Sequence, residues 1–240
     1  MARFVLVHGG AHGGWCWVKV ARLLRAAGHE VHTPTLTGLG ERRHLLSSET
    51  TLSTHIADVV NLIAFEDLTE IILVGHSYGG MVITGVADQL SDRIAELVYL
   101  DAAIPNDGEA LVDWSPALRE LAANEMRSED GVELVLWPDA PSFAIYGVTE
   151  PEDVSWLQGK LTPHPWRCFV EPLRLGNAAA IRALPRTNIN APSTLRRRSG
   201  DSLARSLDAD RVWEIDTGHD MMVTEPERVA DLLLKLGVTA

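Results

Sequence analysis

The chain has 240 residues, of which 46% are hydrophobic and 22% charged, and this length and composition fit one globular α/β domain with a full hydrophobic core. Its formal net charge of −12 at pH 7 argues against binding to nucleic acid or to an anionic membrane surface, because both need clustered lysine and arginine. The two cysteines do not make a disulfide framework, and no signal peptide or membrane-spanning stretch is evident, so we expect a cytoplasmic protein.

Apolar runs of strand length alternate with segments of helical periodicity in the first part of the chain. Residues 4–7 predict a buried strand. The apolar positions that follow recur every three or four residues, as on one face of a helix, at Trp17, Val20, Ala21 and Leu24. Gly28 can end this helix in the left-handed conformation, and residues 31–33 begin another strand.

The same alternation continues along the chain. Residues 56–63 have helical spacing, residues 71–74 predict a buried strand, residues 81–90 a helix and residues 97–100 a further strand. Strands that alternate with helices in this way form a mostly parallel sheet with helices on both faces. We therefore predict an α/β fold.

The middle of the chain breaks this pattern. Residues 105–185 contain repeated prolines and four tryptophans, at Trp114, Trp137, Trp156 and Trp166. The alternation resumes with a strand at residues 212–215 and a helix that ends at Gly237. We predict a core made of residues 1–104 and 186–240, interrupted by a helical cap insertion at residues 105–185.

The sequence Gly-His-Ser-Tyr-Gly at residues 75–79 matches the pattern G-x-S-x-G and lies directly between a predicted strand and a predicted helix. A sharp turn at this place holds the serine hydroxyl out into the crevice at the carboxyl ends of the strands, and the flanking glycines avoid collisions there. This context makes Ser77 the candidate nucleophile. We expect the neighbouring His76 to pack behind the turn.

An acyl-transfer enzyme also needs N–H groups that stabilise the oxyanion of a tetrahedral intermediate. The N–H of Tyr78, at the start of the helix after the nucleophile, is one candidate, and the N–H of Gly10, in the glycine-rich turn at residues 8–14, is the second. That turn could instead cradle a phosphate, but it lacks the Lys-Ser/Thr of a P-loop and the spacing G-x-G-x-x-G.

His219 is the candidate general base. It belongs to the sequence Thr-Gly-His-Asp at residues 217–220, after the last predicted strand and before the last predicted helix. This position puts it at the same rim of the sheet as Ser77, and the order of serine before histidine fits such a fold.

With these motifs the chain resembles the α/β-hydrolase superfamily, and within it the small branch of esterases and hydroxynitrile lyases that includes plant methyl-salicylate esterases and bacterial esterases. The resemblance covers most of the chain and is carried by residues 4–9, 12–17, 37–42, 75–80 and 216–220. The sequence Gly-Leu-Gly-Glu-Arg in the third of these segments looks like the bacterial members, some of which hydrolyse xenobiotic esters and carbamates such as pyrethroids and carbendazim.

The resemblance implies a triad acid that holds the histidine, and here the chain departs from the family. Members of the branch place the acid after the strand that precedes the last one, but the corresponding residues 185–195 contain no Asp or Glu. Asp101 ends the strand that follows the nucleophile strand and reaches the same rim, an arrangement similar to that of some haloalkane dehalogenases. Asp201 is a second candidate, and a Ser-His dyad without an acid is a third.

We therefore predict a serine hydrolase that forms a covalent acyl-enzyme on a small apolar carboxylic ester or carbamate, or on an activated amide. The prediction includes no cofactor, no metal and no oligomeric state. A hydroxynitrile lyase is an alternative, but the resemblance implies a lysine after the catalytic histidine in such lyases, where this chain has Asp220. A non-catalytic ligand receptor on the same scaffold is another, which the presence of both Ser77 and His219 disfavours. We assign no function to the basic run at residues 196–198.

Overall fold

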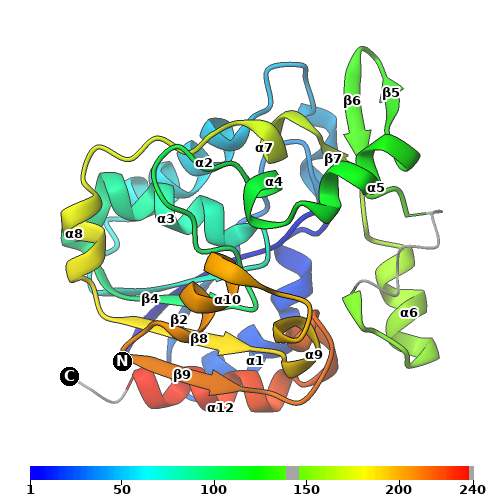
Figure 1. Ribbon diagram of the computed structural model, residues 1–240. Coiled ribbons are helices and arrows are strands. Elements are labelled where there is room, and N and C mark those ends of the chain that lie inside the picture. The colour runs from blue at the N-terminus through cyan, green and yellow to red at the C-terminus, as the bar shows by residue number, and fades with distance from the viewer. Residues whose placement is uncertain (139–145, 238–240) are drawn as a thin grey trace.

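A six-stranded sheet forms the centre of the protein in the computed structural model, which describes residues 1–138 and 146–237 (Figure 1). Neighbouring strands are parallel throughout, in the order β2-β1-β3-β4-β8-β9. These strands are β1 (Arg3–Val7), β2 (Glu30–His32), β3 (Ile71–His76), β4 (Ile94–Leu100), β8 (Arg186–Asn190) and β9 (Arg211–Glu214). The α/β fold with a mostly parallel sheet is confirmed.

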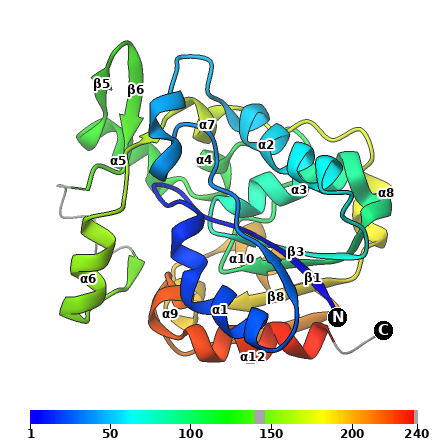
Figure 2. The ribbon, with the colours of Figure 1, turned by 180° about the vertical axis from the view of Figure 1, so that it is seen from behind.

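Helices cover both faces of the sheet (Figures 1 and 2). On one face α1 (Val18–Ala26) packs against α12 (Pro226–Leu236), and on the other α3 (Gly79–Leu90) packs against α2 (Leu52–Phe65) and α8 (Ala178–Ala183). Short helices in the connections are α9 (Pro192–Leu195), α10 (Gly200–Leu207), α11 (Met221–Thr224) and the 3₁₀ helices Gly14–Trp17, Gly40–Leu45 and Ser91–Arg93. Among the described residues, none of the helices combines the length and apolarity that a membrane crossing needs.

The helix α1 illustrates how the sequence pattern produces these layers. Its apolar residues Val20, Ala21 and Leu24 are buried against the core, as their helical spacing predicts. Gly28 follows the helix with φ of +84°, the left-handed conformation predicted for its end. The chain then returns directly into β2, which pairs in parallel with β1.

The register of the central strands brings their carboxyl ends together. All six residues of β3 are buried, as expected for a strand with helices on both sides. Val7 at the end of β1 pairs with Gly75, and Leu100 at the end of β4 pairs with His76. The loops that follow β1, β3 and β4 therefore meet at one edge of the sheet.

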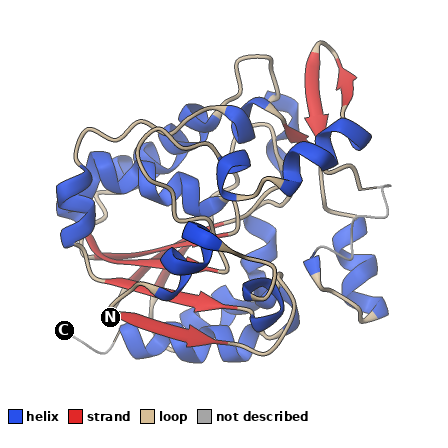
Figure 3. Ribbon diagram, viewed as in Figure 1, coloured by secondary structure: helices blue, strands red, loops and turns tan. Residues whose placement is uncertain are grey.

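Most of the segment that we predict as a cap lies beside this edge, as Figures 1 and 3 show. It contains the helices α4 (Leu111–Trp114), α5 (Ala117–Glu125), α6 (Pro151–Gln158) and α7 (Arg167–Val170). It also contains an antiparallel sheet of β5 (Arg127–Glu129), β6 (Val132–Val135) and β7 (His164–Pro165), which the prediction of a helical insertion did not include. Asp130 and Gly131 join β5 to β6 with φ of +50° and +79°, the positive values of a tight hairpin turn. The strands were not predicted because strands this short show no clear alternation of apolar and polar residues.

Candidate active site

Ser77 sits in the turn between β3 and α3 with φ of +54°, a left-handed conformation that is unfavourable for a residue with a side chain. The turn is fixed because the Ser77 N–H donates to the carbonyl of Leu100 (3.3 Å), and the Ser77 carbonyl accepts from the N–H of Ala103 (3.0 Å). A Cβ atom at Gly80 would lie 2.0 Å from the carbonyl oxygen of Ala103, so only glycine allows α3 to pass this close. The backbone thus fixes where the Ser77 side chain starts.

The two predicted oxyanion donors lie beside the serine. Gly10 and Tyr78 line the same cavity as Ser77. The Tyr78 N–H precedes the first residue of α3, so it has no carbonyl one turn earlier to bind, and the positive end of the helix dipole lies there. Both residues therefore lie at the cavity onto which Ser77 opens.

The structure brings together His219 and Asp101. The distance from Nδ1 of His219 to Oδ2 of Asp101 is 2.5 Å. Because an ionised carboxylate only accepts hydrogen bonds, Nδ1 carries the proton and the lone pair is on Nε2. The two side chains of His219 and Ser77 line one cavity without a hydrogen bond between them, a contact that in enzymes often tightens only when substrate is bound.

Asp101 is buried and held as a carboxylate. Burial alone would raise the pKa of Asp101, but the hydrogen bond and charge of His219, followed by the charge of Arg198, hold it below its usual value. The second oxygen, Oδ1, lies 3.3 Å from Nη2 of Arg198 and accepts from the N–H of Ala191 (3.5 Å). Asp101 also has a positive φ, of +45°, directly after β4.

Arg198 is a site residue that the sequence reasoning missed, because the basic run was given no function. Its side chain is only 8% exposed. Besides Asp101 it contacts Oγ of Ser206 (2.6 Å), and its guanidinium lies 5.4 Å from the centre of the Trp114 ring. The signal was its place in the chain, because Arg198 follows β8 just beyond residues 185–195, the stretch in which the resemblance implied the triad acid.

The other candidate acid, Asp201, is exposed in the first turn of α10. Among the described residues, no hydrogen bond or ion pair joins it to His219. The geometry therefore favours Asp101 over Asp201 and over a dyad.

His76 is buried behind the turn. Its Nε2 donates to the carbonyl of His219 (3.0 Å), and its ring lies 4.6 Å from the ring of His219. Burial and then the neighbouring His219 lower the pKa of His76 to about 3, so it is neutral and supports the backbone of the base.

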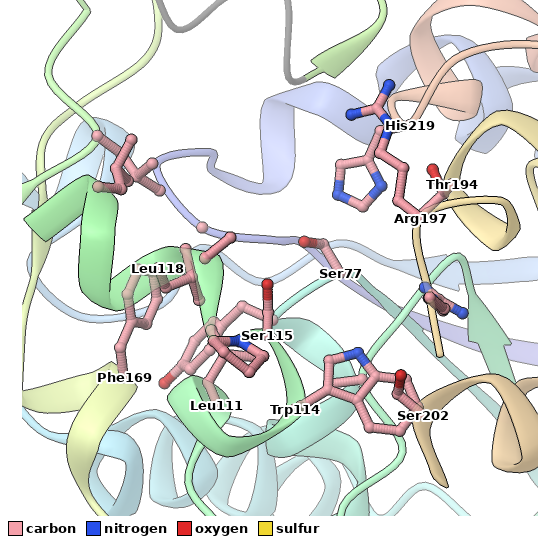
Figure 4. Close-up of a pocket in the computed structure, with 18 of the residues that line it drawn as sticks. Ser77, Leu111, Trp114, Ser115, Leu118, Phe169, Thr194, Arg197, Ser202 and His219 are labelled. Atoms are coloured by element: carbon pink, nitrogen blue, oxygen red, sulfur yellow. The ribbon is translucent and has the colours of Figure 1, made fainter. Parts of the chain in front are cut away.

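A cavity of about 470 Å³ opens onto Ser77. Figure 4 shows the apolar side chains of Leu111, Leu118 and Phe169 on one side of the serine and His219 with Arg197 on the other. Of the four tryptophans at residues 114, 137, 156 and 166, Trp114 is the only one among the described residues that line this cavity. This side of the cavity is apolar, so burial there favours an apolar group, which is thereby removed from water.

Two groups of described side chains have donor atoms close enough to hold a metal ion: His76, His219 and Asp220, and His55, His164 and Cys168. The first includes the candidate base. In the second, His55 Nδ1 accepts from the Tyr78 hydroxyl (2.9 Å), His55 Nε2 donates to the Thr37 carbonyl (2.9 Å), and His164 Nδ1 accepts from the N–H of Ala11 (3.2 Å). These ring nitrogens already support the protein, and we assign neither group a metal.

Comparisons with known proteins identify the family. A profile of the alpha/beta hydrolase family matches residues 4–232. The chain belongs to this family. Within it, the chain is 40% identical over 251 residues to the carbendazim hydrolyzing esterase of Nocardioides sp. (strain SG-4G), covering 99% of this chain and all of the relative, and 27% identical to methylesterase 7 of Arabidopsis thaliana, covering 98% and 95%.

Solved structures of other alpha/beta hydrolases superimpose along the whole chain. An extracellular member from a Paenibacillus species, described as sharing structural and functional homology with tobacco Salicylic Acid Binding Protein 2, has a TM-score of 0.80 at 26% identity, with 98% of both chains covered. The methylesterase MES16 of Arabidopsis has a TM-score of 0.79 at 26% identity, with both chains covered in full. This alpha/beta hydrolase therefore shares its complete fold with esterases.

Proposed function

We propose that the protein is a serine hydrolase that cleaves a small, largely apolar carboxylic ester or carbamate through a covalent acyl-enzyme. The observation that carries the proposal is the 2.5 Å bond from His219 to a buried Asp101, at the rim where Ser77 has its positive φ. A base held in one tautomer beside a serine on a strand-to-helix turn is what acyl transfer requires.

The chemistry runs in two halves. Oγ of Ser77 attacks the substrate carbonyl carbon while Nε2 of His219 accepts the hydroxyl proton, and the N–H groups of Gly10 and Tyr78 bind the oxyanion. His219 then gives the proton to the leaving alcohol or amine, and the acyl-enzyme remains on Ser77. A water molecule activated by His219 attacks the acyl-enzyme and releases the acid, with Asp101 stabilising the imidazolium in both halves.

The substrate class follows from the cavity and from the relatives. The apolar side chains on one side of Ser77 suit an acyl group without charge. The 40% identical relative is named for hydrolysis of carbendazim and the plant relative is named a methylesterase, which supports an ester or a carbamate as the bond cleaved. Neither cleavage needs a cofactor.

The lyase alternative gains no support from the site. Asp220 occupies the position after the base, and its carboxylate is bound to His12 at 2.9 Å. A negative charge beside His219 would oppose a departing cyanide anion.

We place the enzyme in the cytoplasm, where Cys16 and Cys168 would stay reduced; both are buried and unpaired. Fractionation of the cells that make it would test this location.

The function is tested with a panel of aryl esters, alkyl esters and aryl carbamates. The wild type should turn over at least one class, and Ser77→Ala should fold normally yet lose nearly all turnover, because the hydroxyl forms the new bond. A fluorophosphonate should label the wild type at Ser77 only. Retention of a tenth of the wild-type rate by Ser77→Ala would exclude this nucleophile.

A further inference from the structure

Two consecutive peptide groups of the oxyanion loop are held by buried histidines. Nδ1 of His8 donates to the carbonyl of Gly9 (2.8 Å), and Nδ1 of His12 donates to the carbonyl of Gly10 (2.7 Å). Since N–H and C=O point in opposite directions across a trans peptide, the bond from His8 aims the Gly10 N–H away from His8. The N–H of Gly10 therefore belongs to the peptide that His8 holds. His12 holds the following peptide, whose N–H, that of Ala11, also donates to Nδ1 of His164 (3.2 Å), so both planes that flank the Gly10 Cα are set.

This loop needs to be held from outside. Glycine at position 10 leaves the backbone more freedom than any other residue would. Ala11 follows it with φ of +65°, a conformation that costs free energy for a residue with a Cβ atom. Without the contacts to the histidines, this segment would populate other conformations. An N–H group whose direction varies stabilises an oxyanion poorly.

The second ring nitrogen of His12 takes part in a buried ion pair. Nε2 of His12 lies 2.9 Å from Oδ2 of Asp220, and the two side chains are 1% and 0% exposed. With one nitrogen facing a carbonyl and the other a carboxylate, His12 has acceptors for two N–H protons. Burial lowers the pKa of His12, but the charge and hydrogen bond of Asp220 outweigh this and raise it overall.

Asp220 connects His12 to the general base, His219. It follows His219 directly, and its own N–H donates to the carbonyl of Tyr146 (2.8 Å). Residues 10–12 and residues 219–220 come from opposite ends of the chain, so the His12–Asp220 contact ties the loop of the oxyanion donor to the loop of the base.

We propose that the buried His12–Asp220 pair is a positioning device, which fixes the peptide that follows Gly10 and thereby holds the Gly10 Cα, and with it the N–H that serves as an oxyanion donor, in place relative to His219. The inference rests on the proposed function, because it assigns a role within acyl transfer. His12 and Asp220 are positioning residues that do not touch the substrate.

The test separates the two bonds of His12. His12→Gln places an amide near the position of Nε2, so it keeps the contact with Asp220 and loses the bond to Gly10. Its kcat should fall about 10- to 100-fold, toward the loss seen when an oxyanion donor is removed, while KM stays within about threefold. Affinity for a trifluoromethyl ketone, which forms a tetrahedral oxyanion on the serine, should fall by the same factor as kcat. All rates are expressed per active site titrated with fluorophosphonate.

A matched pair of double variants covers the case in which a lone buried charge prevents folding. His12→Asn with Asp220→Leu keeps an amide donor near the position of Nδ1, whereas His12→Leu with Asp220→Leu removes it, and neither contains a buried charge. The first should exceed the second in kcat by about tenfold or more. The control is His32→Gln, the same exchange at a partly exposed histidine–carboxylate contact with Glu30, and it should behave as the wild type.

Equal kcat in the two double variants, or a His12→Gln enzyme within twofold of the wild type, would overturn the proposal. So would a loss confined to KM or to thermal stability, which a purely structural pair would produce. Ester turnover by the wild type reports on the proposed function alone, and the comparison among variants reports on the ion pair.

Discussion

A single carboxylate, that of Asp101, joins three parts of the molecule. One oxygen binds His219, the proposed general base, and the other lies between Arg198 and the N–H of Ala191. A carboxylate with both oxygens held cannot rotate, so it fixes the orientation of the imidazole as well as its tautomer. The residue assigned as triad acid from its position after β4 therefore has the contacts that this role needs.

Replacement of this residue separates a triad acid from a structural aspartate. Asp101→Asn keeps a side chain of the same shape but favours the wrong tautomer of His219, so kcat should fall by a large factor, up to about 10⁴. The exposed Asp201→Asn is the matched control and should leave kcat within about twofold of the wild type. Steady-state kinetics on one aryl ester decide it, and a collapse of kcat at Asp201 with a silent Asp101 would reverse the assignment.

At the scale of elements, the segment between β8 and α10 differs from what the family resemblance implied. The family resemblance led us to look for an acid there, and the segment instead supplies Arg198 to an acid that has moved to the end of β4. Arg198 also lies over Trp114 of α4, so the same side chain links this helix to the carboxylate of Asp101. The cation compensates for the burial of the carboxylate, which an apolar side chain could not do.

The role of this cation predicts a change in pH dependence. Arg198→Met should raise the pKa of Asp101, because the charge of the guanidinium helps to hold this pKa down. A rise of about one unit corresponds to roughly tenfold in the affinity of the carboxylate for a proton. At acidic pH, where a raised pKa lets Asp101 take up a proton, Arg198→Met should therefore lose a larger share of its neutral-pH kcat/KM than the wild type does, and its kcat should fall less than that of Asp101→Asn. Arg196→Met, on an exposed neighbour, is the control. An unchanged acid limb in Arg198→Met would show that the cation is not coupled to the acid.

The elements differ in how far their sequence predicts them. The strand β3, the turn at Ser77 and the helix α3 follow from a buried apolar run, a G-x-S-x-G motif and helical spacing, each of which is local. The antiparallel strands β5, β6 and β7 have two to four residues each, which is too few to show a period. The Asp-Gly pair at residues 130–131 is the one local signal that could have indicated the hairpin of β5 and β6. The place of Arg198 in the chain was a signal, but the sequence alone could not identify its partner, Asp101, which is 97 residues away.

At the scale of the whole molecule, the His12–Asp220 pair makes stability depend on pH. Burial opposes ionisation of Asp220, but the charge and hydrogen bond of His12 hold its pKa below the usual value, so its stabilisation is complete above about pH 4 and is lost as the pH falls through the lowered pKa. The pKa of His12 is raised, so its stabilisation is complete below about pH 6.5 and is lost as the pH rises through the raised pKa.

The free energy of unfolding of the wild type, relative to His12→Leu with Asp220→Leu, should therefore be most favourable between about pH 4 and 6.5 and decline on both sides. The neighbouring His76, with its pKa near 3, stays neutral through this window and does not produce the same profile. Urea unfolding at a series of pH values measures the difference. A difference that is constant from about pH 3 to 9 would mean that the pair is not ionised in the folded protein.

The central claim is that acyl transfer passes through a covalent bond to Ser77. The most direct measurement is mass spectrometry of the wild type quenched in acid during turnover of a slowly hydrolysed aryl ester or carbamate. We predict a mass increase equal to the acyl or carbamoyl group, on the peptide that contains Ser77, which decays when substrate is exhausted. Turnover without any adduct, or an adduct on another residue, would contradict the account.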